Sequence, residues 1–277
     1  MKRFKVSFLI VLFSVVLGCG SAFASPVSYF GYDFSTKSIL DAEKSESNTE
    51  DDLLCWAAVA ANVLVATGWG SVYSASEDSI FEYYQDHWTD AGGLPEFAWE
   101  WWFNGTNAMQ GESGWSQVDV AGGAFYPETI FLDYYSRTWD DALVLSAIDQ
   151  YLHAGDGVTL ALYGPGGHSI TVWGYDYDDA TGDYLGIWVT DSDDDKTDPT
   201  PENELKYYDV LYSGDQWFLE NFYGSNDWYI GEVMALGYMP TAGPVPEPAT
   251  VILFGCGILA LAGAGRKRFR KSEASPE

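Results

Sequence analysis

Helix-like hydrophobic spacing in the earlier part of the chain is followed by strand-like runs in the later part, and this order constrains the fold more than any other feature. Apolar residues first recur at helical spacing, which predicts four helices, over residues 55–67, 77–87, 94–103 and 142–153. Short β-branched and aromatic runs between Gly-containing turns then predict strands, over residues 158–163, 169–175, 184–190, 206–211 and 229–238. Helices followed by strands are typical of an α+β domain with an antiparallel sheet, and not of an alternating βαβ fold.

The N-terminal segment differs from this middle part. A basic start and an apolar run precede Ala22-Phe23-Ala24, which has the small-x-small pattern of a signal-peptide cleavage site. We therefore expect residues 1–24 to be a signal peptide that is removed on secretion. Residues 25–243 are then long enough for one domain with a sizeable core, and residues 244–277 form a separate C-terminal segment.

The C-terminal segment contains three parts in order. VPEPAT at residues 245–250 precedes an apolar stretch at 251–265, and five basic residues follow within 266–271. The stretch is short for a membrane helix of about 20 residues, but its basic flank favours transient membrane contact through residues 251–265. Together the parts resemble the PEP-CTERM sorting signal, with its Pro-Glu-Pro motif, transmembrane segment and Arg-rich tail. This resemblance implies an exosortase as partner and a final location at the cell surface or in the extracellular matrix; an ordinary membrane anchor is the alternative.

The charge of the central segment is strongly negative. Residues 25–243 hold 38 of the 41 acidic residues but only five of the 13 basic residues. Such a surface repels nucleic acid and anionic membranes, so we expect no nucleic-acid partner. The acidity suits an extracellular protein that stays soluble or binds divalent cations.

Cys55 is the only cysteine of the central segment, because Cys19 lies in the predicted signal peptide and Cys256 in the C-terminal segment. It stands at the start of the first predicted helix, where the helix dipole favours a thiolate. A thiolate nucleophile also needs an imidazole partner. The alternative is a buried cysteine that acts as a small hydrophobic residue.

Three histidines can supply that imidazole. His87 and His153 fall inside or at the end of predicted helices, where an exposed or helix-capping role is expected. His168 follows Gly-Pro-Gly-Gly and opens a predicted strand, so its side chain can face a cleft at a sheet edge. Asp191 ends a neighbouring antiparallel strand and can orient the imidazole, as the third member of a catalytic triad does.

Three short sequence words make this pattern more specific. They are DDLLC with two following alanines at residues 51–58, HSITVWGYDYD at 168–178 and VTDSD at 189–193. They resemble the IdeS/Mac cysteine peptidases, which are secreted and have a papain-like fold. The resemblance spans roughly residues 40–195 and implies an α+β papain-like fold, with an N-terminal helical part that carries the nucleophile and a C-terminal antiparallel sheet.

The resemblance also implies a role for each site residue. Cys55 is the nucleophile, His168 the general base and acid, and Asp191 the group that orients the imidazole. Asp193 is a second acidic residue that supports the site. Lys44 completes the oxyanion hole with the backbone N–H of Cys55, although it lies one residue further from the cysteine than the family's lysine. No metal or other cofactor is implied.

We therefore expect a secreted cysteine endopeptidase that acts on an unidentified extracellular protein; hydrolysis and acyl transfer both remain open. The alternative is a non-catalytic matrix or adhesion protein on the same scaffold that binds calcium or polysaccharide. Asp191, Asp193, Asp195 and Glu202 approximate the ligand spacing of a calcium loop. Lys196, however, stands where such a loop requires glycine.

Overall fold

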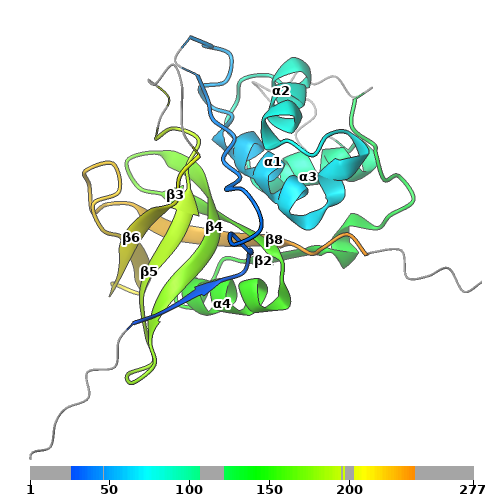
Figure 1. Ribbon diagram of the computed structural model, residues 1–277. Helices are drawn as coiled ribbons and strands as arrows, with labels where there is room; N and C mark the ends of the chain where they lie inside the picture. Colours follow the sequence, from blue (N-terminus) through cyan, green and yellow to red (C-terminus); the bar gives the residue numbers. More distant parts are fainter. Residues whose placement is uncertain (1–25, 46, 107–121, 195, 197–202, 241–277) are drawn as a thin grey trace, which may run out of the picture.

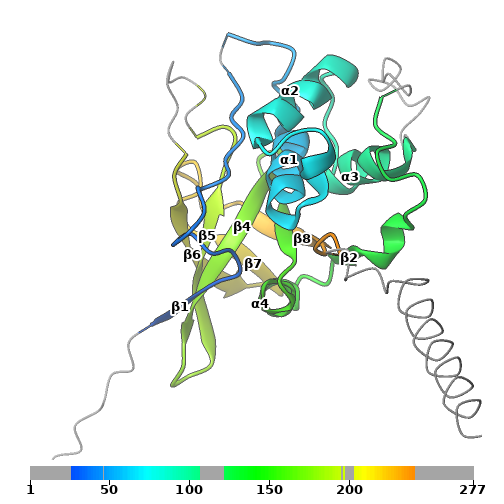
Figure 2. The same cartoon turned by 45° about the vertical axis from the view of Figure 1, so that its right-hand side comes forward.

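The computed structural model describes residues 26–45, 47–106, 122–194, 196 and 203–240 (Figure 1). The predicted signal peptide and the C-terminal segment lie outside these residues. The elements run in the order β1 (Val27–Phe30), α1 (Cys55–Thr67), η1 (Trp69–Val72), α2 (Glu77–His87), α3 (Pro95–Asn104), η2 (Phe131–Asp133), β2 (Tyr135–Thr138), α4 (Val144–Ala154), β3 (Gly157–Tyr163), β4 (Gly167–Asp178), β5 (Asp183–Thr190), β6 (Lys206–Ser213), β7 (Gln216–Leu219) and β8 (Tyr229–Leu236). Helices α1, α2 and α3 lie together on one side of the sheet, and α4 lies at its lower end (Figures 1 and 2).

Six of the strands form a closed antiparallel barrel. The ring runs β4-β3-β8-β7-β6-β5, and β5 pairs back with β4. The join between β7 and β8 is narrow, with Phe218 opposite Tyr229. Strands β1 and β2 lie outside the ring, where β1 pairs with β4 and β2 with β8.

The predicted fold class is therefore wrong. The structure is a mostly β molecule built on a closed six-stranded barrel, with four α-helices among the described residues, and not a papain-like α+β arrangement. The four helices and five strands predicted from periodicity are each present within a few residues of their expected bounds. Periodicity does not report which distant strands pair. Closure depends on the long strand β4, which pairs with β3 over its first half, with β1 over its second half and with β5 across register shifts on its other edge.

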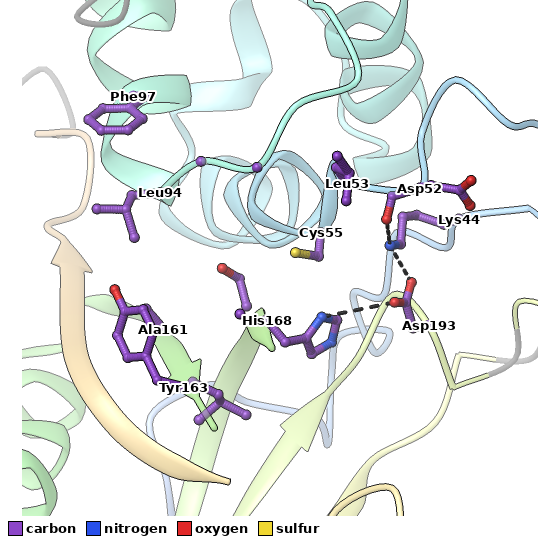
Figure 3. A pocket seen from close by; sticks show the side chains of 15 residues that line it. Lys44, Asp52, Leu53, Cys55, Leu94, Phe97, Ala161, Tyr163, His168 and Asp193 are labelled. Carbon is purple, nitrogen blue, oxygen red and sulfur yellow. Dashed lines mark hydrogen bonds and ion pairs between the residues drawn. The ribbon is translucent and has the colours of Figure 1, made fainter. Parts of the chain in front are cut away.

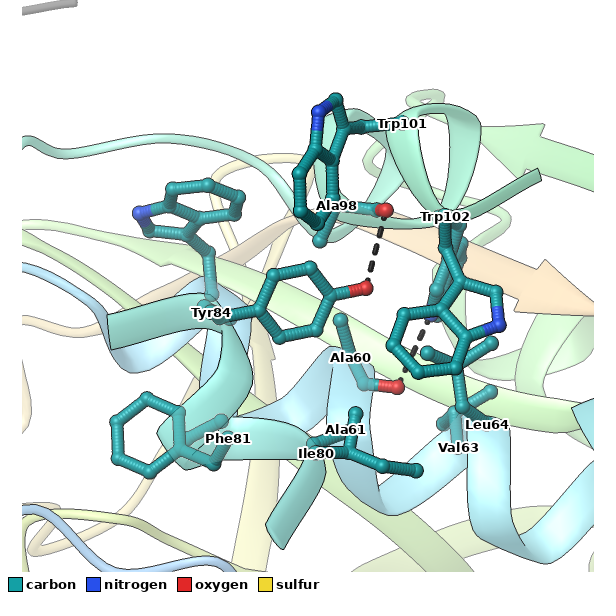
Figure 4. Close-up of a cluster of buried hydrophobic side chains, with 14 of the residues drawn as sticks. Ala60, Ala61, Val63, Leu64, Ile80, Phe81, Tyr84, Ala98, Trp101 and Trp102 are labelled. Carbon is teal, nitrogen blue, oxygen red and sulfur yellow. Dashed lines mark hydrogen bonds between the residues drawn. The ribbon is translucent and has the colours of Figure 1, made fainter. Parts of the chain in front are cut away.

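Alternating residues of β3 separate the two main parts of the core. Val158, Leu160 and Leu162 pack with α4 and the barrel strands, whereas Ala161 packs with the three-helix group. Helix α1 is buried on nearly all sides and ends at Gly68, whose φ of 87° suits glycine. The helical part of the core is dominated by buried tryptophans of α1 and α3, namely Trp56, Trp99, Trp101 and Trp102. Figure 4 shows Trp101 and Trp102 among the side chains that pack there. This packing fixes α1 with its N-terminus at one edge of the barrel.

Candidate active site

Three elements bring the predicted site residues to this edge. Strands β4 and β5 are antiparallel, with Thr171 opposite Thr190, so the start of β4 and the end of β5 lie side by side. His168 is the second residue of β4, and Asp191 follows the last residue of β5. Helix α1 begins at the same edge with Cys55, whose sulfur points toward the space above His168 (Figure 3).

The imidazole of His168 is held by Asp191 on its Nε2 side. Its Nε2 atom lies 2.6 Å from Oδ1 of Asp191. Both side chains are buried, since His168 is 7% exposed and Asp191 is 0% exposed. Cys55 lies close enough to the imidazole for each group to shift the pKa of the other.

These contacts favour a charged pair. Burial opposes the charge of His168, but Asp191 and Cys55 outweigh it and raise the pKa of His168 to about 10. Burial likewise opposes ionisation of Cys55, but the hydrogen bond and charge of His168, assisted by Lys44, hold the pKa of the thiol below its usual value. The N-terminal end of α1 adds a positive helix dipole beside the sulfur. Both shifts act in the direction of a thiolate beside an imidazolium.

Asp193 lies on the Nδ1 side of the imidazole, and Lys44 pairs with Asp193 there. Lys44 is 2% exposed, and its Nζ atom lies 2.6 Å from Oδ1 of Asp193. The same Nζ atom donates a 2.7 Å hydrogen bond to the backbone carbonyl of Asp52. Oδ2 of Asp193 lies 3.9 Å from Nδ1 of His168 (Figure 3). The structure thus gathers all five residues predicted for the site.

A cavity of about 400 Å³ opens over these residues. Lys44, Cys55, His168 and Asp193 line one side of it. The opposite side is largely apolar and is formed by Leu94, Phe97 and Tyr163 (Figure 3). An apolar cavity of this size with a few convergent polar groups is typical of a ligand site.

The two aspartates before α1 do not cap its first turn. Leu54 occupies the N-cap position, and no side chain caps the helix. Asp52 pairs with Lys196 instead, and Asp51 accepts a 2.9 Å hydrogen bond from Gln85. The first N–H groups of a helix have no acceptor within it, so the backbone at Cys55 can donate to an oxyanion in the cavity.

Tyr223 is a site residue that the sequence did not reveal. Its hydroxyl group donates a 2.7 Å hydrogen bond to Oδ2 of Asp191. It lies in a tight turn with a φ of 49°, between Asn221 at 57° and Gly224 at 72°. Non-glycine residues with such angles are strained and concentrate at functional sites. The contact joins chain segments 32 residues apart, and no local pattern marks it.

Asn62 is a second residue that sequence reasoning missed. Its Oδ1 atom accepts a 2.9 Å hydrogen bond from the backbone N–H of Ala42, and its Nδ2 atom donates to Thr171 at 3.1 Å. It therefore ties the segment before Lys44 to both α1 and β4. An asparagine inside an otherwise apolar helix was the only signal available for it.

The other two histidines lie outside this site, whereas two members of the calcium-loop alternative belong to it. Nδ1 of His87 lies 2.8 Å from the carbonyl of Tyr83, and Nδ1 of His153 lies 2.7 Å from Asp149, so both contact their own helices. Asp191 and Asp193 of the calcium-loop alternative are engaged with His168 and Lys44. Its other two members, at positions 195 and 202, lie outside the described residues.

Comparison with known proteins identifies the C-terminal segment. Residues 244–268 match the PEP-CTERM protein-sorting motif, so the chain carries a signal for export, processing by an exosortase and sorting to the cell envelope or surface. No curated protein matches the chain. Within the part of the chain that the structure describes, no helix has the length and apolar character needed to cross a membrane. The membrane contact predicted at residues 251–265 lies outside that part.

Proposed function

We propose that this protein is an exported cysteine peptidase of the IdeS/Mac kind, with Cys55 as nucleophile. The observation that supports the proposal best is the position of His168. Its Nε2 atom is fixed by buried Asp191, and Cys55 lies close enough to raise the pKa of His168, with both residues lining a cavity. The three sequence words that resemble this peptidase family contain these same residues.

The proposed reaction is acyl transfer to Cys55 followed by hydrolysis. The Cys55 thiolate attacks a peptide carbonyl carbon and forms a C–S bond. The C–N bond then breaks as Nδ1 of His168 gives its proton to the leaving amine. His168 next removes a proton from water, which attacks the thioester, and the C–S bond breaks to release the acid and regenerate the thiolate. Asp191 keeps the imidazole in place through both steps.

Two donors can stabilise the oxyanion that forms in each step. One is the backbone N–H at the uncapped start of α1, and the other is the Lys44 ammonium group, which lines the same cavity. Asp193 holds Lys44 in position through their 2.6 Å contact. Each such donor contributes about 3–4 kcal/mol to transition-state stabilisation.

The substrate proposed is an extracellular protein. The sorting motif directs the chain to the cell envelope or surface, and we propose that it acts there or in the extracellular matrix. The apolar side formed by Leu94, Phe97 and Tyr163 favours apolar side chains next to the cleaved bond.

The experiment is a cleavage assay with the exported full chain and a peptide library digested from whole-cell protein. Mass spectrometry detects new termini, and added methylamine distinguishes hydrolysis from acyl transfer. We expect cleavage by the wild type, none by Cys55→Ala or His168→Ala, and unchanged cleavage by His153→Ala, which alters an exposed histidine outside the site. Cleavage that survives in Cys55→Ala contradicts the proposal, and an inert wild type favours the matrix or adhesion protein.

A further inference from the structure

A second group of acidic side chains lies behind the candidate active site. Asp41, Glu43 and Asp194 each place one carboxylate oxygen within 4.8 Å of the other two. Asp41 and Glu43 belong to the segment before α1, and Asp194 belongs to the loop after β5. The cluster therefore joins two segments that are about 150 residues apart in sequence.

Asp41 makes this group unusual among acidic clusters. It is 0% exposed, and among the described residues no N–H or hydroxyl group donates a hydrogen bond to its carboxylate oxygens. Its close neighbour is Glu43, another carboxyl group. A buried carboxylate without a donor is costly, so a proton or a cation must neutralise the group.

The local charges leave room for one divalent ion. Lys206 supplies a positive charge, because its Nζ atom lies 2.8 Å from Oδ2 of Asp194. Three ionised carboxylates and one ammonium group carry a net charge of −2. Glu204, which also contacts Lys206 at 3.3 Å, is exposed and solvated.

We propose that Asp41, Glu43 and Asp194 form a calcium site. Calcium binds carboxylate oxygens at about 2.3–2.6 Å, so one ion can contact oxygens that lie up to about 4.8 Å apart. A set of oxygen donors without nitrogen or sulfur selects hard cations over zinc or copper. This site is distinct from the loop spacing of Asp191 and Asp193, whose side chains are engaged elsewhere.

An ion here joins two segments that flank the active-site residues. Hydrogen bonds already connect them, from Thr190 Oγ1 to the carbonyl of Leu40 at 3.2 Å and from the N–H of Lys44 to the carbonyl of Ser192 at 3.0 Å. Calcium adds a further connection directly beside Lys44. It therefore stabilises the folded chain whether or not the chain is a peptidase, so its test is independent of cleavage.

The test is a thermal-unfolding titration of the exported full chain with calcium chloride after treatment with EDTA. We expect the midpoint to rise by several degrees with a dissociation constant of about 0.1–1 mM, the range of extracellular calcium modules. Asp41→Asn removes the charge but keeps the shape of the buried group, and we expect it to weaken calcium binding at least tenfold. Asp215→Asn is the matched control, because Asp215 is exposed with a φ of 68° that asparagine tolerates.

Two results overturn the proposal. One is an unchanged midpoint at about 10 mM calcium in the wild type, which means that a proton neutralises the cluster. The other is an equal calcium response in the wild type and Asp41→Asn, which places the ion elsewhere. Isothermal titration calorimetry on the folded variants gives the same comparison if Asp41→Asn changes the unfolding midpoint by itself.

Discussion

Tyr223 and His168 hold opposite oxygens of the Asp191 carboxylate. The Tyr223 hydroxyl group donates to Oδ2 at 2.7 Å, and Nε2 of His168 lies 2.6 Å from Oδ1. The backbone N–H of Asp193 also donates to Oδ1, at 3.1 Å. Burial opposes the charge of Asp191, but His168 and these donors outweigh it and lower its pKa. The carboxylate is therefore charged and fixed in orientation, and it fixes the imidazole in turn.

Tyr223→Phe removes one of these donors and keeps the ring. We expect kcat/KM to fall about tenfold, because a hydrogen bond to a charged group contributes about 1.5–3 kcal/mol. The pKa of Asp191 rises when the donor is lost, so the acid limb of the rate profile moves to higher pH. Tyr212→Phe, at an exposed tyrosine of β6, is the control. An acid limb that stays in place shows that Tyr223 does not act on Asp191.

Asp191→Asn tests the orientation of the imidazole more severely. The amide keeps the shape of the carboxyl group but loses its charge. It therefore no longer stabilises the charged imidazole or holds its ring in the productive orientation. We expect kcat to fall by about 10³–10⁴-fold, as in other triads. Circular dichroism checks that the variant remains folded. A loss of less than tenfold shows that Asp191 does not orient the imidazole during catalysis.

Lys44→Met separates oxyanion binding from structural support. We expect kcat to fall by about 10²–10³-fold with little change in KM, because the ammonium group acts on the transition state. Stability also falls, since Asp193 loses its 2.6 Å partner. The double variant Lys44→Met with Asp193→Asn removes the unpaired charge and should recover stability but not kcat. Recovery of both shows that Lys44 only supports the fold.

The packing inside the barrel predicts how much a core substitution lowers the free energy of unfolding. Leu160 is 0% exposed in β3 and packs with the α4 and barrel cluster. We expect Leu160→Ala to lower the free energy of unfolding by about 2–5 kcal/mol, as for other buried leucines. Leu211→Ala, at a residue of β6 that is 48% exposed, should change it by less than about 0.5 kcal/mol. Urea unfolding measures both, and equal losses contradict the described core.

The sequence predicted helix α1 with its correct bounds because local spacing and a terminal glycine specify a helix. It also pointed to His168 and Asp191, because each stands at the end of a recognisable strand. It did not predict barrel closure, which depends on pairing between β7 and β8 and on the bulged register of β4. It missed Tyr223 for the same reason, since that contact exists only when distant turns meet.

Alkylation tests most directly whether Cys55 is a thiolate held by His168, as proposed above. Iodoacetamide labelling of Cys55 is followed by mass spectrometry between about pH 5 and pH 9, in the wild type and in His168→Ala. The lowered pKa of Cys55 predicts fast labelling that persists toward acidic pH in the wild type. In His168→Ala, labelling should follow an ordinary thiol with a pKa of about 8.5 or higher. If the wild type already follows that ordinary profile and the variant does not differ from it, Cys55 is an inert thiol and not the proposed nucleophile.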